Sequence, residues 1–114
     1  MVLIESLDME RTFKIMVNHI VAWNIKEEYE SDKKEIALEA KNRLEALVDA
    51  VPGIISINVV VNEMKSSTVD VTLFCKFDDV KVLEAYQVCP QHLEVAGYIR
   101  EHMCNRTCID YEEQ

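Results

Sequence analysis

The chain has 114 residues, of which 49% are hydrophobic, and a formal net charge of -9 from 21 acidic and 12 basic residues. This length and composition predict one domain with a hydrophobic core of its own. The acidic balance argues against nucleic acid or an anionic membrane as a partner, and a content of two glycines and two prolines argues against a flexible linker.

The amino-terminal residues 1–15 have an ambiguous periodicity, and we expect them to form an extension to a domain over residues 16–114. The extension lacks the basic start of a secretory signal, and no segment holds the roughly 18 apolar residues that span a bilayer. We therefore expect a cytoplasmic protein with reduced thiols. Four cysteines are expected mainly as small core residues: Cys75, Cys89, Cys104 and Cys108.

Residues 16–25 alternate in the pattern of a strand, with His19, Val21 and Trp23 on one face. Both faces are partly apolar, which predicts a central strand that is covered on both sides. A helix then follows, with Ser31 or Asp32 as its cap. Its buried stripe is predicted from apolar residues at helical spacing: Ala37, Ala40, Leu44, Leu47, Val48 and Val51.

The sequence Val51-Pro52-Gly53 ends this helix, because proline interrupts the hydrogen-bond ladder and glycine tolerates the turn. Residues 54–63 and 68–77 alternate as two strands, and the short connection between them predicts an antiparallel hairpin.

A second helical region begins after Asp78-Asp79 and is interrupted by Pro90, so that one helix ends near Val88 and another begins around Gln91. This break is expected to direct Tyr86 and His92 toward the same space. Residues 104–113 then alternate without interruption, which predicts the last strand.

The order strand, helix, strand, strand, helix, strand predicts an α+β, ferredoxin-like protomer with a four-stranded antiparallel sheet and its helices on one face. The other face of the sheet would expose Ile20, Ala22, Val60 and Phe74. Because such a patch is unusual on a monomer, the pattern predicts a homodimer.

Five motifs are distinctive: VNHIVAWNIK, VPGI after the first helix, the F-D-D turn, EAYQVCPQHLEVAGYI and CIDYE. Over residues 16–111 they resemble the stress-responsive A/B barrel (Dabb) family, which includes the plant polyketide cyclase olivetolic acid cyclase. The resemblance implies a dimeric α+β barrel, in which the sheets of two ferredoxin-like protomers close into one barrel.

The resemblance also implies site residues. The cyclase segment has the form Y-x-x-H-P-x-H, to which Tyr86, Pro90 and His92 correspond, while Cys89 replaces the first histidine. His19 matches the family's histidine in the first strand. In a cyclase, His92 would remove a proton next to a carbonyl, and the Tyr86 hydroxyl would stabilise the enolate oxygen.

Three functions remain open from the sequence. The first is binding of a small apolar or aromatic ligand between sheet and helices, with His19, Val21, Trp23 and Cys89 as contacts. The second is a cofactor-independent cyclase, isomerase or monooxygenase that uses Tyr86 and His92. The third is a purely structural or assembly module, in which Tyr86 is a core residue and His92 holds the helix break.

No cofactor and no metal site are expected from the motifs. Cys104 and Cys108 lie four residues apart, with His102 nearby and Cys75 on another strand. Four residues of strand span about 13 Å, too far for one tetrahedral site unless the strand bends, and neither a CxxC pair nor an HExxH motif is present.

Overall fold

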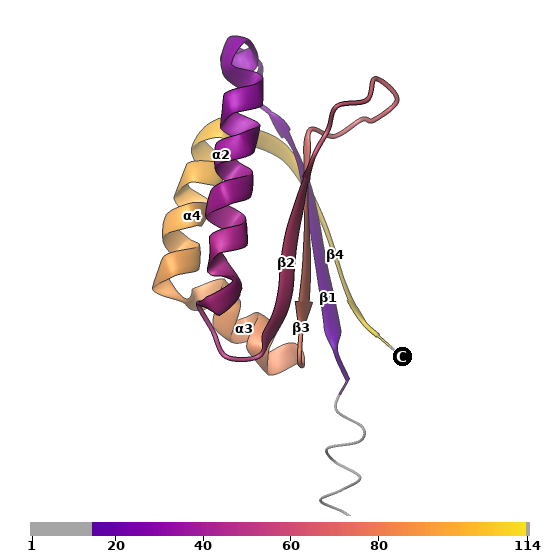
Figure 1. Ribbon diagram of the computed structural model, residues 1–114, viewed down its shortest axis with the longest axis vertical. Coiled ribbons are helices and arrows are strands. Elements are labelled where there is room, and N and C mark those ends of the chain that lie inside the picture. The colour runs from indigo at the N-terminus through magenta and orange to yellow at the C-terminus, as the bar shows by residue number, and fades with distance from the viewer. Residues whose placement is uncertain (1–14, 114) are drawn as a thin grey trace, which may run out of the picture.

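The computed structural model describes residues 15–113, so most of the predicted extension over residues 1–15 lies outside the described residues. Four strands and three α-helices follow one another in the predicted order (Figure 1). Two 3-10 helices, η1 and η2, flank α2. The elements are β1 (Val17–Ile25), η1 (Glu27–Asp32), α2 (Lys33–Glu45), η2 (Ala46–Asp49), β2 (Ile54–Val61), β3 (Val71–Phe77), α3 (Val80–Val88), α4 (Pro90–His102) and β4 (Met103–Glu112).

The four strands form one antiparallel sheet in the order β2-β3-β1-β4. All three α-helices lie on the same side of this sheet (Figure 1). The predicted α+β, ferredoxin-like fold is therefore confirmed. In β1 every odd-numbered residue is buried and every even-numbered residue is partly exposed, because the odd-numbered side chains face the helices.

Helix α2 is shorter than its apolar stripe predicted. The α-helical segment ends at Glu45, and the chain continues as η2 before it turns at Pro52. Gly53 has a φ of 98°, and a Cβ atom at this position would lie 2.6 Å from Cγ2 of Val82. This turn therefore requires glycine, as the sequence predicted for the end of the helix.

The predicted capping residues differ in their contacts. Asp32 occupies the N-cap of α2, but its side chain makes no capping hydrogen bond. Asp79 caps α3 as expected, since its Oδ1 accepts a hydrogen bond of 3.1 Å from the backbone N–H of Val82. The carboxylate thereby satisfies one of the free N–H groups at the start of this helix.

The predicted helix break at Pro90 is also confirmed. Cys89 has extended backbone angles, φ -69° and ψ 144°, and Pro90 is the first residue of α4. Proline suits that position because its missing N–H would have no partner inside the helix.

Strand β4 is not as regular as predicted. Met103 lies opposite Ile25, but the register with β1 shifts between Ala22 and Asn24, and Cys108 then lies opposite Val21. Asn105, in the part of β4 where the shift occurs, has a φ of 56°. A β-bulge of this kind places two residues opposite one, so the prediction of uninterrupted alternation in this strand is wrong.

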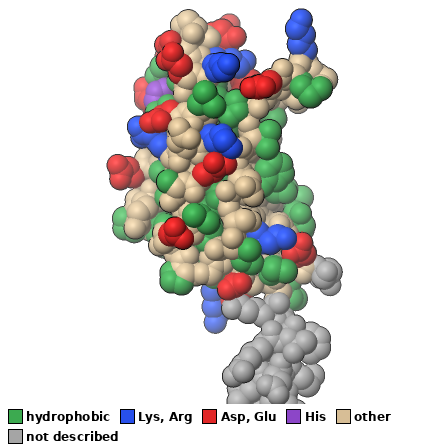
Figure 2. Space-filling view, in the orientation of Figure 1, with side chains coloured by type: hydrophobic (Ala, Val, Ile, Leu, Met, Phe, Trp, Pro, Cys, Tyr) green, Lys and Arg blue, Asp and Glu red, His purple; other side chains and the backbone are tan. Residues whose placement is uncertain are grey.

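The sheet face that points away from the helices remains uncovered in one protomer. Hydrophobic side chains appear along this side of the molecule in Figure 2. The large exposed apolar residues on this face are Val60, Phe74, Ile109 and Tyr111.

The four cysteines are free, but only Cys75 is a buried core residue. Cys108 is exposed, so the expectation that it belongs to the core is wrong. Within residues 15–113, no helix is long and apolar enough to cross a membrane.

Candidate functional site

A cavity of about 400 Å³ lies between the sheet and the helices, next to the start of β4. Its walls are largely apolar, and its polar groups come from β1, α4 and β4. The apolar side chains include Val21, Trp23, Leu44, Leu73 and Ile99, and the polar ones are His19, His92, Arg100, Asn105 and Arg106. A mostly apolar cavity with a few convergent polar groups is typical of small-molecule sites.

A second hollow, of about 560 Å³, lies beside the amino-terminal end of α2. Two of its charged groups are paired, since Nζ of Lys33 lies 3.0 Å from Oδ1 of Asp70. This hollow is larger, but none of the site residues predicted from the sequence lines it, so we regard the cavity with the two histidines as the candidate site.

The break at Pro90 brings Tyr86 and His92 together, as the sequence predicted. The centroids of their rings are 4.5 Å apart. His92 lines the cavity, together with the predicted contacts His19, Val21 and Trp23. Tyr86 is completely buried, and neither Tyr86 nor Cys89 is part of the cavity lining.

Two buried polar atoms at this contact lack a hydrogen-bond partner among the described residues: the Tyr86 hydroxyl and Nδ1 of His92. The polar group that the hydroxyl interacts with is the Cys75 thiol, which is only a weak hydrogen-bonding group. Buried polar groups in native proteins are nearly always paired, and an unpaired one costs about 1–3 kcal/mol.

The surroundings of these two groups favour their neutral forms. Burial lowers the pKa of His92, a hydrogen bond with the backbone of Gln87 opposes this shift, and the charges of Arg106 and Arg100 add to it. Burial, and secondarily the Cys75 thiol, raise the pKa of Tyr86. At neutral pH the site thus holds an imidazole that can accept a proton and a phenol that can donate a hydrogen bond.

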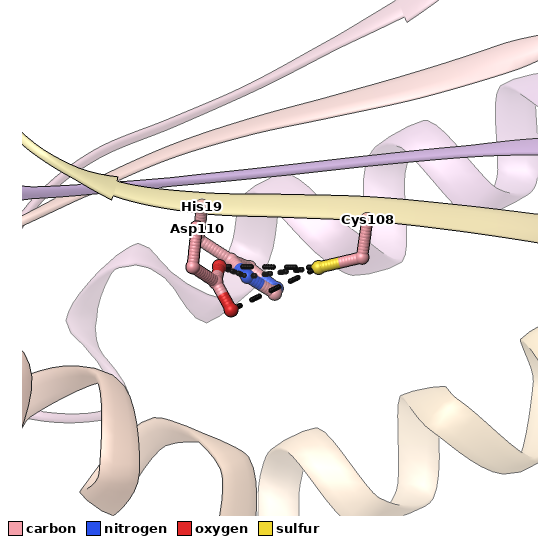
Figure 3. A group of neighbouring side chains, drawn as sticks. All are labelled: His19, Cys108 and Asp110. Carbon is pink, nitrogen blue, oxygen red and sulfur yellow. Dashed lines mark hydrogen bonds and ion pairs between the residues drawn. The ribbon is translucent and has the colours of Figure 1, made fainter.

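His19 has a different environment on β1. Its Nδ1 bonds to Oδ1 of Asp110 on β4, and Cys108 lies beside both residues (Figure 3). The Cys108 sulfur is 3.8 Å from Nδ1 of His19 and 3.9 Å from Oδ1 of Asp110. His19 is only 3% exposed, so the carboxylate satisfies a nitrogen that would otherwise be buried without a partner.

Sequence reasoning placed His19 at the floor of the cavity but missed Asp110 and Cys108. His19 and Asp110 lie directly opposite each other in the sheet. The register of β1 against β4 would have identified both residues as neighbours of His19, but this register depends on the bulge near Asn105.

With this geometry described, the sequence can be compared with known families. Residues 17–113 match the stress responsive A/B barrel domain. The chain belongs to this family. No curated protein matches the sequence of this A/B barrel protein.

Solved structures share the fold of this A/B barrel protein over nearly their whole length. A Bacteroides fragilis protein has 27% identity and a TM-score of 0.79, covering 86% of this chain and 96% of its own. A Jannaschia protein has 26% identity and a TM-score of 0.71, covering 86% and 99%. Both are described as dimeric, ferredoxin-like proteins of unknown function.

A hydroxynitrile lyase from Passiflora edulis is also similar, with 13% identity and a TM-score of 0.69, covering 89% of this chain and 95% of its own. At this identity the likeness concerns the fold alone.

Proposed function

We propose that this A/B barrel protein binds a small, mostly apolar or aromatic ligand in the cavity between the sheet and α4. The observation that carries the proposal is the composition of this cavity: about 400 Å³ of largely apolar wall with His19 and His92 inside. The imidazole of His92, which lines the cavity, gives the ligand a polar partner among these apolar walls.

The cavity also suggests the charge of the ligand. Arg100 and Arg106 belong to its lining, and both influence the pKa of His92. Two guanidinium groups at one cavity are notable in a chain with a net charge of -9. They favour a ligand whose apolar body carries an anionic oxygen group such as a carboxylate.

The first experiment is a screen of small aromatic and aliphatic carboxylic acids by thermal shift, followed by calorimetry. The variant Ala96→Phe would fill the cavity, because Ala96 is part of its wall. The matched control is Ala85→Phe on the exposed side of α3. Compounds should stabilise the wild type and the control but not Ala96→Phe. Equal binding by Ala96→Phe, or no binding to the wild type, would refute the proposed site.

The neutral imidazole of His92 in the cavity wall favours acid–base catalysis as a second candidate. In this reaction the imidazole takes a proton from the carbon next to a ligand carbonyl and returns it after the enolate has reacted. Tyr86 lies behind His92 rather than in the cavity wall, so we assign it the role of positioning the imidazole. The proton transfer needs no metal or organic cofactor.

Isotope exchange tests this second function. A bound ketone in deuterated water should exchange its α-protons in the presence of the wild type and not of His92→Gln. Because burial lowers the pKa of His92, exchange should persist below the usual histidine pKa of about 6.5 and be lost only as the pH falls through the lowered value. Exchange by His92→Gln at the wild-type rate would exclude His92 as the base.

We further propose that the protein is a homodimer whose interface is the uncovered sheet face. The exposed apolar residues Val60, Phe74, Ile109 and Tyr111 support this assembly. The dimeric state described for the Bacteroides fragilis and Jannaschia proteins supports it as well.

A further inference from the structure

We propose that His19, Cys108 and Asp110 form a binding site for a zinc-like divalent metal ion. This site goes beyond the proposed ligand binding. The three residues come from two neighbouring strands, and their potential ligand atoms all lie within 4.8 Å of one another. Their side chains converge on the helix side of the sheet (Figure 3).

The convergence follows from strand geometry. His19 and Asp110 are directly opposite each other, and Cys108 lies opposite Val21, the next inward-facing residue of β1. Residues i and i+2 of one strand point to the same face, and the facing residue of the neighbouring strand joins them. Three ligand atoms are thereby held by two hydrogen-bonded strands rather than by a loop.

The distances are close to those of a tetrahedral zinc site. Zinc bonds of about 2.0–2.3 Å imply roughly 3.5 Å between neighbouring nitrogen, oxygen and sulfur ligands. The sulfur of Cys108 lies 3.8 Å from Nδ1 of His19 and 3.9 Å from each carboxylate oxygen of Asp110. The hydrogen bond between His19 and Asp110 must open to admit the ion, which a rotation of the partly exposed Asp110 side chain allows.

The donor chemistry also selects the metal. A combination of imidazole nitrogen, thiolate sulfur and carboxylate oxygen suits zinc better than magnesium or calcium, which prefer oxygen ligands. On binding, the Cys108 thiol releases its proton to water. His19 coordinates through Nδ1 and keeps its proton on Nε2. Three protein ligands leave one position of a tetrahedral ion for water or another ligand, as in catalytic rather than structural zinc sites.

The sequence predicted no metal site, and that prediction considered Cys104 and Cys108 as a pair of ligands. Those residues do not share one regular stretch of strand, because the register shift near Asn105 separates them. The proposed ligands instead combine Cys108 and Asp110 of β4 with His19 of β1, which is distant in sequence. Cys104 is not one of them, which makes it a matched control.

The test is titration of the full-length, reduced protein with Zn²⁺ in competition with a chromophoric chelator. A parallel titration with Co²⁺ detects thiolate-to-cobalt charge-transfer absorption. The wild type and Cys104→Ser should bind one ion per chain and show this absorption. Cys108→Ser should lose the absorption, and both Cys108→Ser and Asp110→Asn should bind Zn²⁺ at least about 10- to 100-fold more weakly, which is already the loss for an outer-shell partner.

Cys108 and Asp110 are chosen because both are exposed, so circular dichroism should show an unchanged fold in their variants. Failure of the wild type to bind one ion would overturn the proposal, and so would undiminished binding by Cys108→Ser. Loss of binding in Cys104→Ser would assign the ion to a different ligand set. None of these readouts depends on an organic ligand, so the metal site and the ligand cavity can fail independently.

Discussion

The two faces of the sheet both carry large apolar residues, but these residues have opposite environments. Phe77 and Phe74 both belong to β3, yet Phe77 is 0% exposed and Phe74 is 41% exposed. Val59 and Val60 on β2 differ in the same way, at 3% and 56%. The helices cover one face and leave the other uncovered, so the two faces serve different purposes. The covered face supplies stability and the cavity, and the uncovered face supplies the apolar surface of the proposed dimer interface.

The largest expected effect is on the covered face. Phe77→Ala removes a completely buried ring that packs against Tyr86, with 5.2 Å between the ring centroids. The free energy of unfolding should fall by about 3–5 kcal/mol, because the cavity left behind can collapse only partly. Urea denaturation measures this loss. A loss below about 1 kcal/mol would mean that the covered face is packed more loosely than its burial indicates.

The next effect is expected on the uncovered face. Phe74→Asp places a charge within the proposed dimer interface and should convert the dimer to a monomer, since an unpaired buried charge is costly. Sedimentation velocity measures the mass. The control is Val88→Asp on α3, an exposed apolar residue outside the sheet face, which should leave the dimer intact. A dimer that persists in Phe74→Asp would assign the interface to another surface.

The smallest effect concerns the attachment of α2 to β2. Oε2 of Glu45 accepts hydrogen bonds from Nζ of Lys41 at 2.8 Å and from the backbone N–H of Val59 at 2.9 Å. The hydrogen bond from Lys41, and then that from Val59, lower the pKa of Glu45 against the opposing effect of burial. The contribution of the Glu45 carboxylate to stability is therefore complete above its usual pKa of 4.5. This contribution is lost as the pH falls through the lowered pKa of the folded protein.

Glu45→Gln should accordingly cost about 0.5 kcal/mol at neutral pH, since the pair is partly exposed to solvent. The variant should also show a shallower loss of stability in acid. Urea denaturation at several pH values between neutral and acid measures both effects. Glu39→Gln, which removes a more exposed partner of Arg43, is the control. Identical acid profiles for the wild type and Glu45→Gln would contradict the assigned role.

Local sequence signals predicted most of the fold because each element carries its own signal. Alternation marked β1, β2 and β3, and Asp79, Gly53 and Pro90 marked a helix start, a turn and a helix break. The contact between Tyr86 and His92 was predictable for the same reason, since both residues flank one break in the chain. The shortening of α2 was missed because a 3-10 turn continues the apolar spacing of an α-helix closely.

The contacts of His19 could not be predicted in this way. Asp110 is distant in sequence, and its position opposite His19 follows from strand pairing across the whole chain. The exclusion of Tyr86 from the cavity lining likewise depends on how α3 and α4 pack against the sheet. Such features are set by tertiary packing, which single-sequence periodicity does not report.

The bulge in β4 reverses which residues of the alternating strand face the helices. Met103, an odd-numbered residue, faces the covered side opposite Ile25, whereas Cys108 and Asp110, which are even-numbered, face that side after the bulge. With Met103 in place and no bulge, Ile109 and Tyr111 would point toward the helices instead. A single extra residue therefore decides which side chains of β4 face the helices and which face the uncovered side, so changes in the length of this segment should alter the cavity and the proposed dimer interface together.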